Sequence, residues 1–274
     1  SALGANTTAS NNTAVGKNSL QNNTTGANNT AIGREALLSN TTGGFNTALG
    51  STTLDANTIG QYNTALGQAA MGTNVDGSRN TAVGYAALFT MEPDSESDTY
   101  NTAVGFEALK LNTTGIQNTA IGGLALDANT TGGNNTALGM GALGNATTAN
   151  SNTAVGLNAS VGNTTGSGNV SVGQDTLFAA TTADNNVAVG KGAGVAVTTG
   201  EQNTILGEAS AELLTTGNDN IAIGHDAADN LTTGQQNIAI GVDTSLSAAD
   251  GANQIVMGQN VTCVGNSNFT FGDG

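Results

Sequence analysis

The stretch that decides the fold is residues 29–45, Asn-Thr-Ala-Ile-Gly-Arg-Glu-Ala-Leu-Leu-Ser-Asn-Thr-Thr-Gly-Gly-Phe. Its first five residues, Asn-Thr-Ala-(Val/Ile/Leu)-Gly with close variants, return in fifteen copies along the chain. The copies follow a 17-residue period, except for one 21-residue step between Gly84 and Gly105. A short fixed period predicts one supersecondary unit stacked on copies of itself.

Each repeat is interpreted as one flattened coil. The motif predicts a short strand because its second position is Thr, Val or Ile, which favour a pleated backbone. The invariant motif glycine then suits a positive φ or a close backbone approach. We expect a second short strand at Ala36-Leu37 and a returning turn at Thr41-Thr42-Gly43.

The predicted fold is all-β: a parallel β-roll or β-solenoid of 17-residue coils, with rungs spaced about 4.8 Å apart. Residues 1–274 are expected to form a single repeat domain with about fifteen rungs over 12–258. An acidic insertion falls at 89–100, and 259–274 forms a degenerate last rung.

The motif positions carry separate expectations. We expect the fourth position to fill the coil and the third, usually Ala, to face a neighbouring chain. Fourteen of the fifteen copies begin with Asn, and stacked amides in register form ladders. The predicted ladder includes Asn12, Asn29, Asn46, Asn63, Asn80, Asn101, Asn118, Asn135 and Asn152.

Composition excludes several function classes. The net charge is −15, with only five Lys and Arg, so the chain lacks the basic clusters that bind nucleic acid. No run of about 18 apolar residues occurs, so membrane insertion is not expected. Each rung supplies few large apolar side chains, which predicts self-association through the alanine face. A homotrimer is favoured, and an end-to-end filament is the alternative.

The repeat, with its Ala-Leu and Thr-Thr-Gly segments, resembles the β-roll repeats of trimeric autotransporter adhesin heads and of phage tail fibres. The resemblance covers residues 12–258 and extends to Asn268-Phe-Thr-Phe-Gly272 as a degenerate copy. It implies a left-handed, trimeric β-roll used for attachment, located extracellularly on a virion or cell surface. Adhesin-head coils are commonly shorter than the coils of this repeat, so the handedness is carried by the resemblance alone.

Catalysis is not expected. His225 is the only histidine and occupies the variable position after a motif glycine, where a solvated side chain is the simplest interpretation. Apart from His225, the chain has no histidine that could activate a serine or cysteine. The hexapeptide repeat of solenoid acyltransferases does not fit the longer period of this chain. We predict a non-enzymatic protein.

One candidate metal site lies in the acidic insertion. Glu92, Asp94, Glu96 and Asp98 alternate along the chain and offer the hard oxygen ligands that Ca²⁺ prefers. The insertion lacks EF-hand spacing, so a solvated, protruding loop is the alternative. No other cofactor is expected.

One candidate binding surface lies beside the insertion. Phe45, Tyr62, Arg79 and Tyr100 each precede a motif Asn on four successive rungs, so stacking predicts a column. Exposed aromatic rings are a platform for sugars, which indicates a cell-surface carbohydrate or receptor as partner. The alternative is that these turn residues pack on one another for local stability.

These patterns predict a rigid trimeric rod that displays a host- or surface-binding face, like a tail fibre or adhesin. The alternative is a self-assembling extracellular filament or matrix protein. An ice-binding β-solenoid is a lesser alternative, because columns such as Thr47, Thr64 and Thr81 repeat in register. Against it, these threonines are expected to face inward.

Overall fold

The computed structural model describes residues 1–93, 95 and 97–273. The chain forms two compact units, residues 1–135 and residues 136–274. Within the described residues every regular element is a β-strand and no helix occurs. The predicted all-β parallel solenoid of 17-residue coils is therefore confirmed, while trimer formation and handedness stay predictions.

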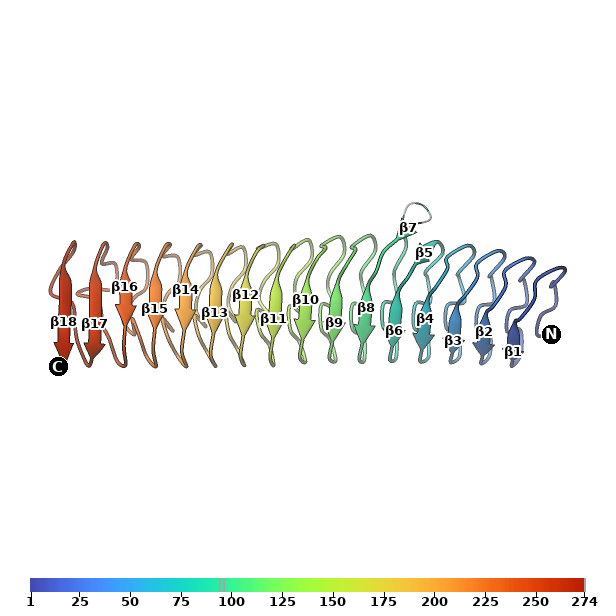
Figure 1. The fold of residues 1–274 in the computed structure, drawn as a ribbon, viewed down its shortest axis with the longest axis horizontal. Coiled ribbons are helices and arrows are strands. Elements are labelled where there is room, and N and C mark those ends of the chain that lie inside the picture. Colours follow the sequence, from blue (N-terminus) through green and yellow to red (C-terminus); the bar gives the residue numbers. More distant parts are fainter. Residues whose placement is uncertain (94, 96, 274) are drawn as a thin grey trace. The chain divides into compact units, whose positions relative to one another are not determined.

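Each coil contributes one short strand to a parallel sheet (Figure 1). In residues 1–135 the sheet order is β1-β2-β3-β4-β6-β8-β9, and β5 pairs separately with β7. The strands of this unit are β1 (Thr13–Val15), β2 (Thr30–Ile32), β3 (Thr47–Leu49), β4 (Thr64–Leu66), β5 (Gly77–Ser78), β6 (Thr81–Val83), β7 (Ser97–Asp98), β8 (Thr102–Val104) and β9 (Thr119–Ile121).

In residues 136–274 the strands pair in sequence order from β10 to β18. They are β10 (Thr136–Leu138), β11 (Thr153–Val155), β12 (Val170–Val172), β13 (Val187–Val189), β14 (Thr204–Leu206), β15 (Ile221–Ile223), β16 (Ile238–Ile240), β17 (Ile255–Gln259) and β18 (Phe269–Asp273).

Strand register follows the sequence period. Thr47 of β3 pairs with Thr64 of β4, so equivalent motif residues lie side by side. The last step is shorter than a full period, because Ile255 of β17 pairs with Phe269 of β18. Equivalent side chains therefore form columns that run across the coils of each unit.

The expected second strand at Ala36-Leu37 is wrong. These residues lie in a turn, and Leu37 has a positive φ of 51°. Glu35 also has a positive φ, of 61°, so the backbone is not extended here. The coils still bond to one another, since the Leu37 N–H donates to the Thr53 carbonyl at 3.0 Å. Leu37 is fully buried, which agrees with its expected inward direction.

The expected orientation of the motif strand is also wrong. The third position faces inward: Ala48, Ala65 and Ala103 are fully buried. The fourth position faces outward, and Val15 and Leu49 are 56% and 45% exposed. The reason is that Leu37 and its equivalents already fill the coil interior from the turn segment, which leaves room there only for a methyl group.

The motif glycines are required by close stacking. Their φ angles lie between 125° and 145°, a region that side chains rarely adopt. A Cβ on Gly33 would also collide with the carbonyl oxygen of Gly50 on the next coil. Both reasons suggested by the sequence, positive φ and close approach, therefore apply.

The motif asparagines connect successive coils mainly through the backbone. The Asn46 Oδ1 accepts from the Asn63 N–H at 3.0 Å, and its Nδ2 donates to the Gly60 carbonyl at 2.8 Å. Direct amide-to-amide bonds occur as well, for example from Asn135 Nδ2 to Asn118 Oδ1 at 3.1 Å. Each side chain thus forms hydrogen bonds with two buried backbone groups, one N–H and one carbonyl.

A second asparagine column, outside the motif strands, was not expected from the sequence. The Asn40 Nδ2 donates to Asn23 Oδ1 at 2.8 Å, and Asn57 Nδ2 donates to Asn40 Oδ1 at 2.8 Å. Met91 occupies this column at the insertion, and its Sδ accepts from Asn112 Nδ2 at 3.2 Å. Met91 has no N–H in its side chain, so Asn74 Oδ1 on the coil before it finds no hydrogen-bond partner among the described residues.

From Ala180 onward the second column is apolar and the core is repacked. Val197, Leu214 and Leu231 replace asparagine and are fully buried. On the coils of Val197, Leu214 and Leu231, the column that holds Leu37 in the other unit is occupied by Gly194 and by alanines. A Cβ on Gly194 would lie 2.8 Å from the Cδ1 of Ile205, so a small residue in this column goes together with large side chains in the neighbouring columns.

The strand orientation predicts opposite responses at adjacent positions. Ala103→Leu forces a large side chain into a filled interior and should destabilise the protein by about 1–3 kcal/mol. Val104→Ala removes outward atoms and should cost under about 1 kcal/mol. Urea unfolding followed by circular dichroism measures both. A larger loss for Val104→Ala than for Ala103→Leu would contradict the orientation.

Candidate functional site

The four residues that precede motif asparagines lie in a line at one edge of the coils. Phe45, Tyr62, Arg79 and Tyr100 all adopt left-handed φ angles, between 51° and 62°. Backbone bonds hold them one coil apart: the Phe45 N–H donates to Ala27, and the Tyr62 N–H donates to Gly44. We call these four residues the aromatic–arginine ladder.

The ladder side chains contact one another face to face. The Phe45 and Tyr62 rings stack with centroids 4.9 Å apart and planes inclined by 7°. The Arg79 guanidinium carbon lies 4.8 Å from the Tyr62 ring centroid and 5.9 Å from that of Tyr100. The structure therefore brings all four predicted residues together, with their side chains about half exposed.

Asp98 holds two members of the ladder, Arg79 and Tyr100, in place. Its Oδ2 lies 2.9 Å from Arg79 Nε and accepts a hydrogen bond from the Tyr100 hydroxyl at 3.1 Å. The hydrogen bond from Arg79 to Asp98 raises the pKa of the guanidinium, which stays protonated. Asp98 lies on β7, which pairs in parallel with β5. This pairing places Asp98 opposite Ser78, the residue before Arg79.

The calcium prediction at the insertion stays a prediction. Glu92 is exposed, and Asp98 is engaged by Arg79 and Tyr100. Asp94 and Glu96 lie outside the described residues.

A second aromatic pair was missed by the sequence reasoning. The Tyr85 and Phe106 rings stack with centroids 5.4 Å apart, and both are about half exposed. The sequence contains the spacing that predicts this pair. Each residue directly follows a motif glycine, and the two glycines belong to successive coils.

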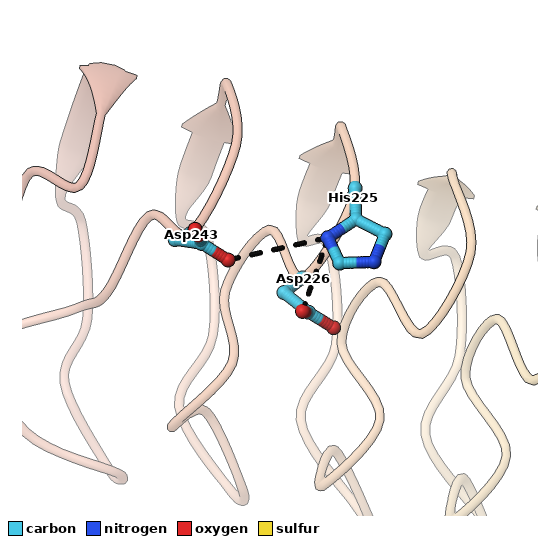
Figure 2. A group of neighbouring side chains, drawn as sticks. All are labelled: His225, Asp226 and Asp243. Carbon is cyan, nitrogen blue, oxygen red and sulfur yellow. Dashed lines mark ion pairs between the residues drawn. The ribbon is translucent and has the colours of Figure 1, made fainter.

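His225 is placed with two carboxylates (Figure 2). Its Nδ1 lies 3.1 Å from Asp226 Oδ2 and 4.0 Å from Asp243 Oδ1. His225 and Asp226 belong to one coil and Asp243 to the next, so the group spans two coils. The three residues are exposed or half-exposed, and we call them the His–Asp cluster. The sequence reasoning treated His225 as a solvated residue and did not connect it with these aspartates.

Two other carboxylates are perturbed by burial. Asp55 and Asp127 occupy equivalent positions in their coils and are half-buried. Loss of solvation raises the pKa of both carboxyl groups, with the neighbouring Glu35 and Glu107 adding to the shift. Neither residue belongs to the ladder or to the cluster.

The outward side chains of the motif strands form a further surface, which we call the outer strand face. It consists of the second and fourth motif positions, none of which is buried in a described strand. In the motif strands from β1 to β9 it combines a threonine column with an aliphatic column, and in β15–β18 both columns are apolar. No charged residue occupies these positions in any motif copy, although the chain's net charge is −15.

Comparison with models of known protein families gave no match, and neither did comparison with curated protein sequences. Across the described residues, no helix is both long and apolar enough to span a bilayer.

Proposed function

We propose that this chain is a rod-like segment of a non-enzymatic attachment fibre at an extracellular or virion surface, similar in role to tail fibres and adhesin heads. The observation that carries the proposal is the aromatic–arginine ladder. The invariant positions of the repeat are all used in stacking, so specific chemistry is left to the variable, exposed positions. Functional residues on a rigid scaffold are commonly found at such positions.

The proposed ligand of the ladder is a cell-surface carbohydrate. Sugar rings pack their C–H faces on aromatic side chains, and their hydroxyl groups bond to neighbouring polar groups. Tyr62 and Tyr100 supply half-exposed rings, while Arg79 and Asp98 supply a charged donor and acceptor between them. Repetition of the same site in an oligomer would raise the avidity of such weak contacts.

The carbohydrate proposal predicts that Tyr62→Ala combined with Tyr100→Ala lowers binding to an array of immobilised cell-surface oligosaccharides by about tenfold or more. The matched control combines Tyr85→Ala with Phe106→Ala, which removes an equally exposed aromatic pair elsewhere. The control should bind like the parent. Equal losses in the two double variants, or no binding by the parent, would contradict the proposal.

We propose further that the rod is a homotrimer associated through the outer strand face rather than through the buried alanines. Large exposed apolar patches commonly mark interaction sites, and this face is most apolar at Ile221, Ile238 and Phe271. A strongly acidic chain repels its own copies, so association is favoured where charge is absent. The equal strand spacing of two copies also lets their side-chain rows interdigitate.

The trimer proposal predicts a sedimentation-equilibrium mass three times that of the 26.8 kDa chain. Ile221→Lys combined with Ile238→Lys would bury charge at the interface and should dissociate the trimer. Gln235→Lys, exposed on the coil of Ile238, is the charge control and should leave the mass unchanged. A monomeric parent would contradict the proposal, and a broad, concentration-dependent mass would favour the filament alternative.

Ice binding is a second candidate, favoured by one observation. The objection to it was an inward threonine column, but Thr47, Thr64 and Thr81 lie on the outer strand face. This function needs the face exposed, whereas the trimer covers it. A monomeric parent that shows thermal hysteresis would therefore support ice binding and exclude the trimer.

A further inference from the structure

The geometry points to a site for a divalent transition-metal ion, such as Zn²⁺, at the His–Asp cluster. We propose that His225 Nδ1, one oxygen of Asp226 and one oxygen of Asp243 bind the ion together. The ion would connect two successive coils of the solenoid. This inference is independent of the proposed attachment function.

The three ligand atoms already lie close together. All lie within 4.8 Å of one another, and His225 Nδ1 is 3.1 Å from Asp226 Oδ2 (Figure 2). Zinc bonds of about 2.0–2.2 Å to nitrogen and oxygen place tetrahedral ligand atoms about 3.3 Å apart. Small rotations of exposed side chains would therefore complete the geometry and leave a position open to water.

The backbone beneath the ligands is fixed. The Asp243 N–H donates to the His225 carbonyl at 3.0 Å, and the Asp226 N–H donates to the Glu208 carbonyl at 3.2 Å. Asp226 and Asp243 also adopt the same left-handed conformation, with φ angles of 49° and 52°. Binding thus requires ordering of side chains only, which lowers its entropic cost.

The placement of the two aspartates is special within the repeat. They occupy the same coil position, the second after a motif glycine, on two successive coils. This is the only place where two acidic residues are consecutive in that column, and it adjoins the chain's only histidine. Like charges on neighbouring parallel segments repel each other, and a bound cation would relieve this repulsion.

The chemistry of the donors selects the ion class. An imidazole nitrogen with two carboxylates suits zinc and similar borderline ions. Calcium prefers six to eight oxygen ligands, and magnesium binds chiefly through oxygen and water. The site is therefore expected to discriminate against both of these hard cations.

The test uses protein without a histidine tag, treated with EDTA and then titrated with ZnCl₂. Because His225 is the only histidine, its imidazole gives a single set of NMR signals that reports the site directly. We expect a saturable shift of these signals with Zn²⁺ and none with equal concentrations of Ca²⁺ or Mg²⁺. No shift with Zn²⁺ would overturn the proposal.

Variants separate a three-ligand site from a lone surface histidine. Asp243→Asn should weaken zinc binding at least about tenfold, because it removes the ligand from the second coil. Asp175→Asn is the matched control, since Asp175 occupies the same column but bonds to the neutral Asn158. Cys263→Ala tests the buried thiol as a competing ligand and should leave binding unchanged. Equal affinity in the parent and Asp243→Asn would overturn the proposal.

Discussion

Parallel stacking at one fixed repeat period is the constraint on which the rest of this structure depends. Each coil bonds to its neighbours through backbone groups, and the motif asparagines hydrogen-bond to buried backbone groups beside the strands. The motif glycines let adjacent backbones approach at the bend. These requirements recur in every coil, so the sequence must repeat them in every coil.

The same constraint divides the side chains into interior and exterior columns. The interior is narrow, so its volume is shared between columns. In residues 1–135 it is filled by Leu37 and its equivalents. In later coils of residues 136–274 it is filled from another column, by Leu214 and Leu231. The exterior columns have no such requirement. Aromatic, charged and apolar residues can therefore accumulate there, as in the aromatic–arginine ladder, the His–Asp cluster and the outer strand face.

Much of this organisation could be predicted from the sequence, because a fixed period determines which residues become neighbours. The proximity of Phe45, Tyr62 and Arg79 followed from their spacing alone. Which face of the motif strand points inward did not follow from the sequence. Alanine and valine are both apolar, and alternation alone does not say which face is covered. The link between His225 and Asp243 was missed because it joins adjacent columns, not positions that are one full period apart.

The most direct test of this account is the contribution of one motif asparagine to stability. Asn46→Ala leaves the Asn63 N–H without its buried acceptor and removes one of the two amide donors to the Gly60 carbonyl, which keeps the bond from Asn57. About 1–3 kcal/mol of unfolding free energy should therefore be lost. Asn22→Ala, at an exposed turn position, should change it by less than about 0.5 kcal/mol. Urea unfolding measures both values. Equal, small losses would contradict the claim that asparagine side chains hold the coils together.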